Sequence, residues 1–250
     1  MGGTRPLGTC RLCGKEASLC RSHIIPEFCY TSAYDSKHRA LQVNYEIDAR
    51  APTRQVQKGL RENMLCEACE ARLSVWEHKF KEYWYTSPGL PPKMDLRYQG
   101  ILMESADYKS FKLFHLSILW RAGESRLCKS VSLGRYAEKI RQMLLAGDPG
   151  PQNILPIIGT VLIQDDGSVF HGWVTSPMRQ RYGPTRVYSA CYAGCEWFVF
   201  VTDHLSKELA DVVKALDKEG KVWLLYSPYQ EAGSMKALFN VMSARRRKNG

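Results

Sequence analysis

The sequence predicts an α+β protein with two parts: a small zinc-stapled ββα finger over residues 1–90, followed by an α+β part over residues 91–250. Two pairs of cysteines with C-x2-C spacing lie in the first part, as in proteins that hold a structural metal ion. The run "TSPGLPPKM" comes next, and we expect the boundary there because glycine and proline break helices and central strands. Beyond residue 150, short apolar runs and alternation predict an antiparallel meander.

The composition is that of a folded globular protein. Of the 250 residues, 44% are hydrophobic and 24% are charged, and a chain of this length can bury a sizeable core. Apolar runs such as "FKLFHLSILW" contain Lys112 and His115 and are shorter than the roughly 20 residues that cross a bilayer. The first residues lack the apolar centre of a secretory signal. We therefore expect no membrane span and a cytoplasmic protein.

The chain carries a formal net charge of +10. Positive potential attracts phosphate backbones, so nucleic acid is the expected partner, with DNA favoured over RNA. Four of the positive charges lie in the "RRRK" run at residues 245–248, which is either a contact surface or a solvated tail. The second part of the chain could in addition bind a protein partner.

Cys10 and Cys13 form the first cysteine pair, and Cys66 and Cys69 form the second. In a reducing compartment, paired C-x2-C spacing indicates metal binding in preference to disulfides. Each C-x2-C turn lets two sulfurs point at one ion, so two such turns can form a tetrahedral four-thiolate site. The sequence therefore predicts one structural Zn²⁺ bound by the four cysteines.

His23 follows the first pair in the run "SHIIPEF". Together with Cys20 it could instead complete a compact zinc site on the first pair, but that arrangement would leave the second pair without partners. If the four cysteines take the zinc, His23 is free for chemistry. Two β-branched residues and a proline follow it, which places it at the edge of a short strand where the chain turns away.

A long insert, residues 27–60, separates His23 from the second cysteine pair. It interleaves aromatic and basic residues, a combination that can follow a phosphate backbone and stack on bases. Acidic residues in the insert dilute its positive charge, so a solvated loop is an equally valid interpretation. The candidate nucleic-acid-binding residues are Lys37, Arg39, Arg50, Arg54 and Lys58.

A helix is predicted over "EARLSVWEHKF", directly after the second cysteine pair. Glu70 and Glu77 are two turns apart and therefore share one face of it. A zinc staple beneath a strand and a helix would set the imidazole of His23 against these carboxylates. Because a neutral imidazole can take a proton from water, this would be a catalytic geometry. The alternative is that His23 is a structural histidine.

The second part begins with two predicted amphipathic helices, at residues 108–122 and 134–147. Apolar runs that predict strands follow at residues 154–163, 169–175, 185–194 and 195–203, with Asp166-Gly167 as a hairpin turn between the first two. A helix at residues 206–220, a strand at 221–227 and a final helix at 234–248 complete the chain. No motif in this part indicates a reaction.

Together, the first C-x2-C pair, "HIIP" and "LC-x2-C" resemble the zinc-knuckle branch of the HNH endonucleases, the ββα-metal or His-Me finger superfamily. The resemblance covers about the first 80 residues. It implies a β-hairpin whose first strand ends in the general-base histidine, here His23. An asparagine that orients the hairpin would correspond to Asn63. Glu70 stands where the family often has a histidine that ligates the catalytic ion, Mg²⁺ or Mn²⁺.

The sequence departs from this family pattern in the place of its asparagine, which in the family usually lies further from the cysteine than Asn63 does, and at two further positions. The family commonly has aspartate before the base histidine and histidine after the last cysteine, whereas this chain has Ser22 and Glu70. A carboxylate can replace imidazole as a ligand of a hard cation, but a hydroxyl replaces a carboxylate poorly. The leading hypothesis is a metal-dependent nucleic-acid endonuclease, and the alternative is an inactive zinc-stabilised module that binds nucleic acid or protein. The candidate catalytic residues are His23, Asn63, Glu70 and Glu77.

Overall fold

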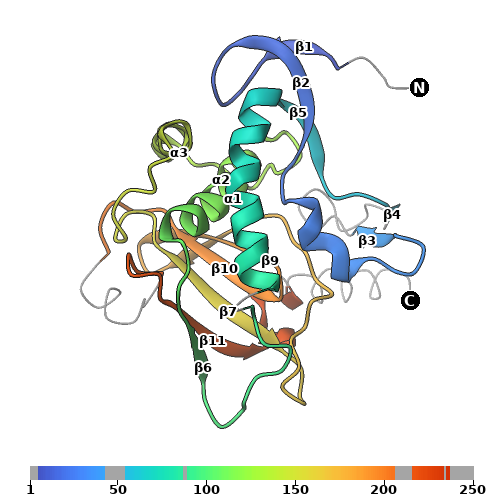
Figure 1. Ribbon diagram of the computed structural model, residues 1–250, viewed down its shortest axis with the longest axis vertical. Helices are drawn as coiled ribbons and strands as arrows, with labels where there is room; N and C mark the ends of the chain where they lie inside the picture. The colour runs from blue at the N-terminus through green and yellow to red at the C-terminus, as the bar shows by residue number, and fades with distance from the viewer. Residues whose placement is uncertain (1–4, 43–53, 87–88, 206–215, 234, 237–250) are drawn as a thin grey trace.

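The computed structural model describes residues 5–42, 54–86, 89–205, 216–233 and 235–236 (Figure 1). These residues contain both α-helices and β-sheets, which confirms the predicted α+β class. A small sheet belongs to the amino-terminal part and a larger one to the carboxy-terminal part, as the sequence indicates.

The amino-terminal part is a three-stranded antiparallel sheet followed by a long helix. The strands are β1 (Leu7–Thr9), β2 (Glu16–His23) and β5 (Arg61–Cys66), in the order β1-β2-β5. Helix α1 (Glu67–Tyr85) begins directly after β5 and runs beside β2 (Figure 1). The antiparallel pair of β2 and β5 followed by α1 is the ββα arrangement that the sequence predicts.

The insert between β2 and β5 carries its own short elements. The 3₁₀ helix η1 (Glu27–Ala33) follows β2 directly. The strands β3 (Ala40–Gln42) and β4 (Arg54–Val56) then pair as a two-stranded antiparallel ribbon. The ribbon lies beside η1, away from the cysteine-bearing end of the finger (Figure 1).

The carboxy-terminal part is built on a six-stranded sheet with the order β6-β11-β7-β10-β9-β8. Neighbouring strands are antiparallel except for β11 and β7, which are parallel. The strands are β6 (Gly100–Met103), β7 (Ile157–Ile163), β8 (Met178–Tyr182), β9 (Thr185–Tyr192), β10 (Cys195–Phe200) and β11 (Val222–Pro228), and the 3₁₀ helix η2 (Tyr229–Glu231) follows them. The consecutive strands β8, β9 and β10 form an antiparallel meander, and β7 pairs antiparallel with β10.

Two details of the meander differ from the prediction. The turn at Asp166-Gly167 leads only to an isolated bridge between Ile163 and Val169, so the run at residues 169–175 is not a strand. Strand β8 was not predicted, because its sequence "MRQRY" is polar and shows no apolar alternation. Such a composition suits an edge strand, which has solvent on one side.

The two helices predicted for the end of the chain lie largely outside the described residues. Of the helix predicted over residues 206–220, the described residues 216–220 form a turn that ends at Gly220, with φ 79°. The final helix predicted at residues 234–248 has only residues 235 and 236 within the described part.

Helix α2 (Tyr108–Glu124) is buried on all sides, whereas the sequence predicts an amphipathic helix. Every residue from 110 to 122 is buried, because α1 packs against one side of α2 and the six-stranded sheet against another. The side chain of Asp107 caps its first turn by accepting a hydrogen bond from the N–H of Ser110 at 3.2 Å. Helix α3 (Arg135–Ala146) has the predicted amphipathic character, with Ile140 and Leu144 buried.

The hydrophobic core continues across residue 90. The ring of Phe80 in α1 stacks on that of Phe114 in α2, with centroids 3.9 Å apart. The indole of Trp84 packs edge-on against Trp197 of β10 at 5.2 Å, and its N–H donates to the carbonyl of Ala193 at 2.9 Å. The two predicted parts therefore share one core in which α1 is a common element.

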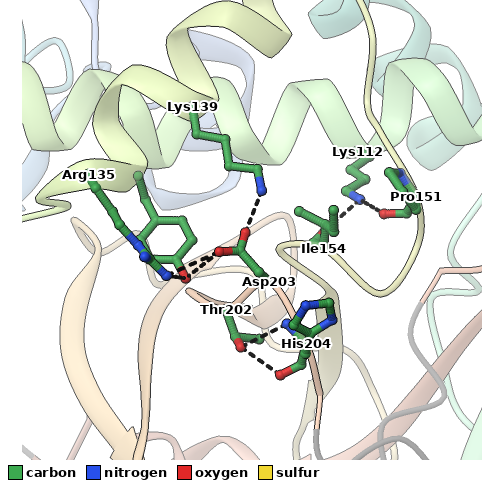
Figure 2. Close-up of polar contacts among 9 residues, drawn as sticks. Lys112, Arg135, Lys139, Pro151, Ile154, Thr202, Asp203 and His204 are labelled. Carbon is green, nitrogen blue, oxygen red and sulfur yellow. Dashed lines mark hydrogen bonds and ion pairs between the residues drawn. The ribbon is translucent and has the colours of Figure 1, made fainter.

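Polar contacts fix the loops around α2 and α3 (Figure 2). The ammonium of Lys112, in α2, donates to the carbonyls of Pro151 and Ile154, each at 2.7 Å. Asp203, just after β10, accepts hydrogen bonds from Lys139 and Arg135 of α3. These contacts tie α3 and the loop before β7 to the rest of the core.

Candidate metal centre and the surroundings of His23

The four predicted cysteines come together at one end of the finger. The Sγ atoms of Cys10, Cys13, Cys66 and Cys69 all lie within 4.8 Å of one another. The first two come from the turn between β1 and β2, and the other two from the end of β5 and the first turn of α1. Such a cluster could bind a metal ion such as zinc, because four thiolates at this spacing form a tetrahedral set.

Backbone hydrogen bonds favour the thiolate form of Cys10, whereas burial raises the pKa of Cys66 and Cys69. The turn closes through the N–H of Gly14, which donates to the carbonyl of Cys10 at 2.8 Å and has φ 75°. The N–H of Cys66 donates to Cys10 Sγ at 3.3 Å. Burial raises the pKa of the Cys10 thiol, but hydrogen bonds, first among them those from the N–H groups of Cys13 and Cys66, outweigh burial and lower it to about 7. A low thiol pKa suits a metal ligand.

The competing zinc set with Cys20 and His23 is not formed. Among the described residues, the cluster that could hold a metal consists of the four cysteines only. His23 lies at the far end of β2 from these cysteines, paired across the sheet with Arg61, and its side chain contacts Glu27.

The cysteine turn is docked onto the helices of the carboxy-terminal part. Leu12, between the first two cysteines, is fully buried, and its carbonyl accepts a hydrogen bond from Arg141 of α3 at 2.7 Å. Arg11 pairs with Glu62 of β5 at 2.5 Å and donates to the carbonyl of Glu124 at the end of α2. The cysteine cluster is therefore joined to α2 and α3 through these two arginines.

His23 ends β2 in a half-buried position, with 26% of its side chain exposed. Its Nε2 atom lies 2.8 Å from Oε2 of Glu27. Burial lowers the pKa of His23, the Glu27 carboxylate opposes this shift, and the guanidinium groups of Arg61 and Arg121 add to it. The net pKa is below the ordinary imidazole value of 6.5, so the ring is largely neutral at pH 7.

Glu27 is a residue of this site that the sequence analysis did not single out. Its other oxygen, Oε1, accepts a hydrogen bond from the hydroxyl of Tyr34 at 2.6 Å and lies 3.7 Å from Nε2 of His38. Burial raises the pKa of Glu27, but the hydroxyl of Tyr34 and the nearby imidazole of His23 lower it by more. The net pKa therefore lies below the ordinary value of a glutamate carboxyl. An acid four residues after His23, within "SHIIPEF", was the feature that could have identified it.

The other three candidate catalytic residues lie elsewhere. Asn63 is exposed and paired with Arg21, so Arg61 and not Asn63 stands opposite His23 in the sheet. Glu70 lies toward the cysteine cluster, where burial raises the pKa of Cys20 and the charge of Glu70 adds to this shift, and its Oε1 atom is buried without a hydrogen-bond partner among the described residues. In the described part of the chain, no hydrogen bond or ion pair joins either residue to His23.

Glu77 is engaged by a residue outside the finger. Its Oε1 atom lies 2.9 Å from the guanidinium of Arg121, a residue of α2 whose side chain is 1% exposed. Ser22, at the family's aspartate position, is also buried. The residues expected to ligate Mg²⁺ or Mn²⁺ therefore do not form one oxygen-rich set beside His23, and they do not fit a divalent ion at that place.

The insert presents part of the predicted basic surface. Lys37 and Lys58 are exposed. Arg39 is held by Asp35, with a guanidinium nitrogen 2.8 Å from a carboxylate oxygen. Arg54 is the first residue of β4, and Arg50 lies outside the described residues.

Comparison of the chain with protein-family models, with curated proteins and with solved structures gave no match. In the part of the chain that the structure describes, no helix combines the length and the apolar character needed to cross a bilayer.

Proposed function

We propose that the protein is a nucleic-acid endonuclease that hydrolyses phosphodiester bonds with His23 as its general base. The observation that carries the proposal is the position of His23: a neutral imidazole at the end of the first strand of a ββα unit whose opposite end holds the cysteine cluster. The resemblance of "C-x2-C", "HIIP" and "LC-x2-C" to HNH endonucleases supports the same role.

The surroundings of His23 suit attack by water on a phosphodiester. A neutral imidazole can take the proton of the attacking water, a function typically worth about 10²- to 10⁴-fold in rate. Arg61, the cross-strand partner of His23, is close enough to lower its pKa, and its positive charge favours a phosphate in the same place. The net charge of +10 would further attract a polyanionic substrate, with DNA favoured over RNA.

Whether cleavage requires Mg²⁺ or Mn²⁺ is left to the experiment described below. The expected ligands do not converge beside His23, because Glu77 is paired with Arg121 and Glu70 lies toward the cysteines. We therefore assign the proton transfer to His23 and the charge stabilisation to the guanidinium of Arg61.

The test is incubation of the purified protein with plasmid DNA and with RNA, each with and without Mg²⁺ or Mn²⁺. We expect cleavage by the native chain and a loss of about 10²- to 10⁴-fold for His23→Ala, with unchanged zinc content and unchanged melting temperature. His78→Ala is the matched control, because His78 is an exposed histidine of α1. Equal cleavage by His23→Ala and the native chain would reject the role of His23.

A second candidate function is a binding module that has lost catalysis. The buried ion pair between Glu77 and Arg121 favours it, because this pair removes a carboxylate that a nuclease of this type could use. The same preparation would then bind DNA or RNA in a fluorescence-anisotropy titration without cutting either in any divalent ion. A protein partner bound through the carboxy-terminal part would be compatible with this function.

A further inference from the structure

We infer that Glu27 is a positioning residue for His23: its carboxylate holds the imidazole with the proton on Nε2, which leaves Nδ1 to accept the proton of water. The catalytic part of this inference rests on the proposed nuclease function. The pairing itself does not, and it can be tested separately.

The backbone after β2 brings the two side chains together. The chain bends at Ile24 and Ile25, Pro26 has φ −54° and ψ 144°, and Glu27 opens η1. This places Oε2 of Glu27 2.8 Å from Nε2 of His23. Both atoms are buried, and neither has a hydrogen bond among the described residues, so this 2.8 Å contact is the close polar contact of each. Separated, the two atoms would lose that contact, and a buried polar atom without a partner is unfavourable, so the two hold each other in place.

Glu27 is itself held from its other side. The Tyr34 hydroxyl donates to Oε1 at 2.6 Å, and the Tyr34 ring lies 4.0 Å, centroid to centroid, from the ring of His38. Because one carboxylate oxygen is fixed by a donor from the end of η1, the other oxygen is aimed at His23. A side chain whose rotamer is locked in this way can orient a catalytic group.

The charges around His23 explain why a carboxylate is needed. Burial lowers the basicity of the ring most, the nearby positive charges of Arg61 in β5 and Arg121 in α2 lower it further, and Glu27 opposes these effects. A general base works best when its pKa is near the working pH, so a base surrounded by guanidinium groups alone would be too weak. An anion on Nε2 restores part of the basicity and selects the tautomer.

The first experiment uses ¹⁵N-edited spectra of the imidazoles of the full chain. In the native protein we expect His23 to be the Nε2–H tautomer at neutral pH. In Glu27→Ala we expect mixed tautomers and a lower titration midpoint for His23. Glu82→Ala is the matched control, since Glu82 forms an exposed i,i+4 pair with His78, the same spacing as Glu27 and His23.

The second experiment measures cleavage against pH. Glu27→Ala is expected to lose at least about 10-fold in kcat, less than His23→Ala, and the acid limb of its profile should move to lower pH. Glu27→Asp should recover part of the rate because it restores the charge. Glu27→Gln keeps the shape of the side chain but removes its charge. It replaces Glu27→Ala in both experiments if the alanine variant fails to fold.

The outcomes separate the two proposals. An unchanged tautomer and an unchanged titration midpoint of His23 in a folded Glu27→Ala or Glu27→Gln variant would overturn the positioning role. Absence of cleavage by the native protein on every substrate would overturn the proposed nuclease and the catalytic part of this inference, while the spectra would still decide the pairing.

Discussion

The guanidinium of Arg121, in α2, lies 2.9 Å from a carboxylate oxygen of Glu77, in α1, and the Arg121 side chain is 1% exposed. The pair joins the helix of the finger to the central helix of the carboxy-terminal part. Arg121 also donates from Nε to the carbonyl of Ser117, so its charge is anchored on both sides. A residue that the sequence suggested for catalysis thus lies in a buried ion pair.

We predict that Glu77→Ala lowers the free energy of unfolding by about 3–5 kcal/mol, because it leaves a buried guanidinium without its carboxylate counter-charge. The double variant Glu77→Leu with Arg121→Met should be less destabilised than Glu77→Ala, since it removes both charges. Urea denaturation measures the free energy of unfolding of the native protein, of Glu77→Ala and of the double variant. The control is Glu67→Ala, which removes an exposed ion pair with Arg5 and should cost less than about 1 kcal/mol. If Glu77→Ala lost as little free energy of unfolding as the control, the stabilising role of the Glu77–Arg121 ion pair would be contradicted.

We predict one zinc ion per chain and its loss in Cys66→Ser, because the binding free energy of such a site contributes directly to folding. Through Arg141 and Arg11, loss of the ion should also increase hydrogen exchange at the ends of α2 and α3. Elemental analysis and exchange mass spectrometry measure the two effects. Cys20→Ser is the matched control and should retain the metal, since Cys20 lies outside the cluster. Native protein purified without any bound zinc would refute the prediction.

We predict that the acid limb of the cleavage profile lies below pH 6.5. Cleavage requires neutral His23, and burial together with Arg61 and Arg121 lowers the pKa of this ring. Activity should therefore persist as pH falls through 6.5 and decline only as pH passes through the lower pKa of the folded protein. The unfolded chain takes up this proton at higher pH, so the same shift makes the free energy of unfolding fall below about pH 6.5. Measured kcat/KM against pH would contradict this if the limb lay above 6.5.

We predict that the exposed lysines of the insert contribute to nucleic-acid affinity through phosphate contacts. Lys37→Ala and Lys58→Ala should each reduce the dependence of log Kd on log salt by about 0.7–0.9, the effect of one phosphate contact. Lys218→Ala, an exposed lysine near the end of the chain, is the control. Arg39→Ala should act differently, because Arg39 is held by Asp35 and its loss disturbs the loop. Unchanged salt dependence in both lysine variants would place the binding surface elsewhere.

Some features followed from local sequence. The cysteine cluster was predictable because C-x2-C spacing forces two sulfurs to one side of a turn whatever surrounds it. The strands β9, β10 and β11 were predictable because their apolar runs are bounded by glycine turns or by a change of composition. The place of His23 at the end of a strand followed from the residues after it.

The neighbours of those residues were decided by the tertiary structure. Glu27 contacts His23 because the chain bends at Ile24 and Ile25, and Arg121 reaches Glu77 because α2 packs on α1. The all-round burial of α2 likewise depends on elements that precede and follow it by tens of residues. Spacing along a chain fixes what lies within one turn or one strand. Distances across the fold and burial decide which charged side chains are paired and which remain available for catalysis. Both arise only when the whole core is assembled.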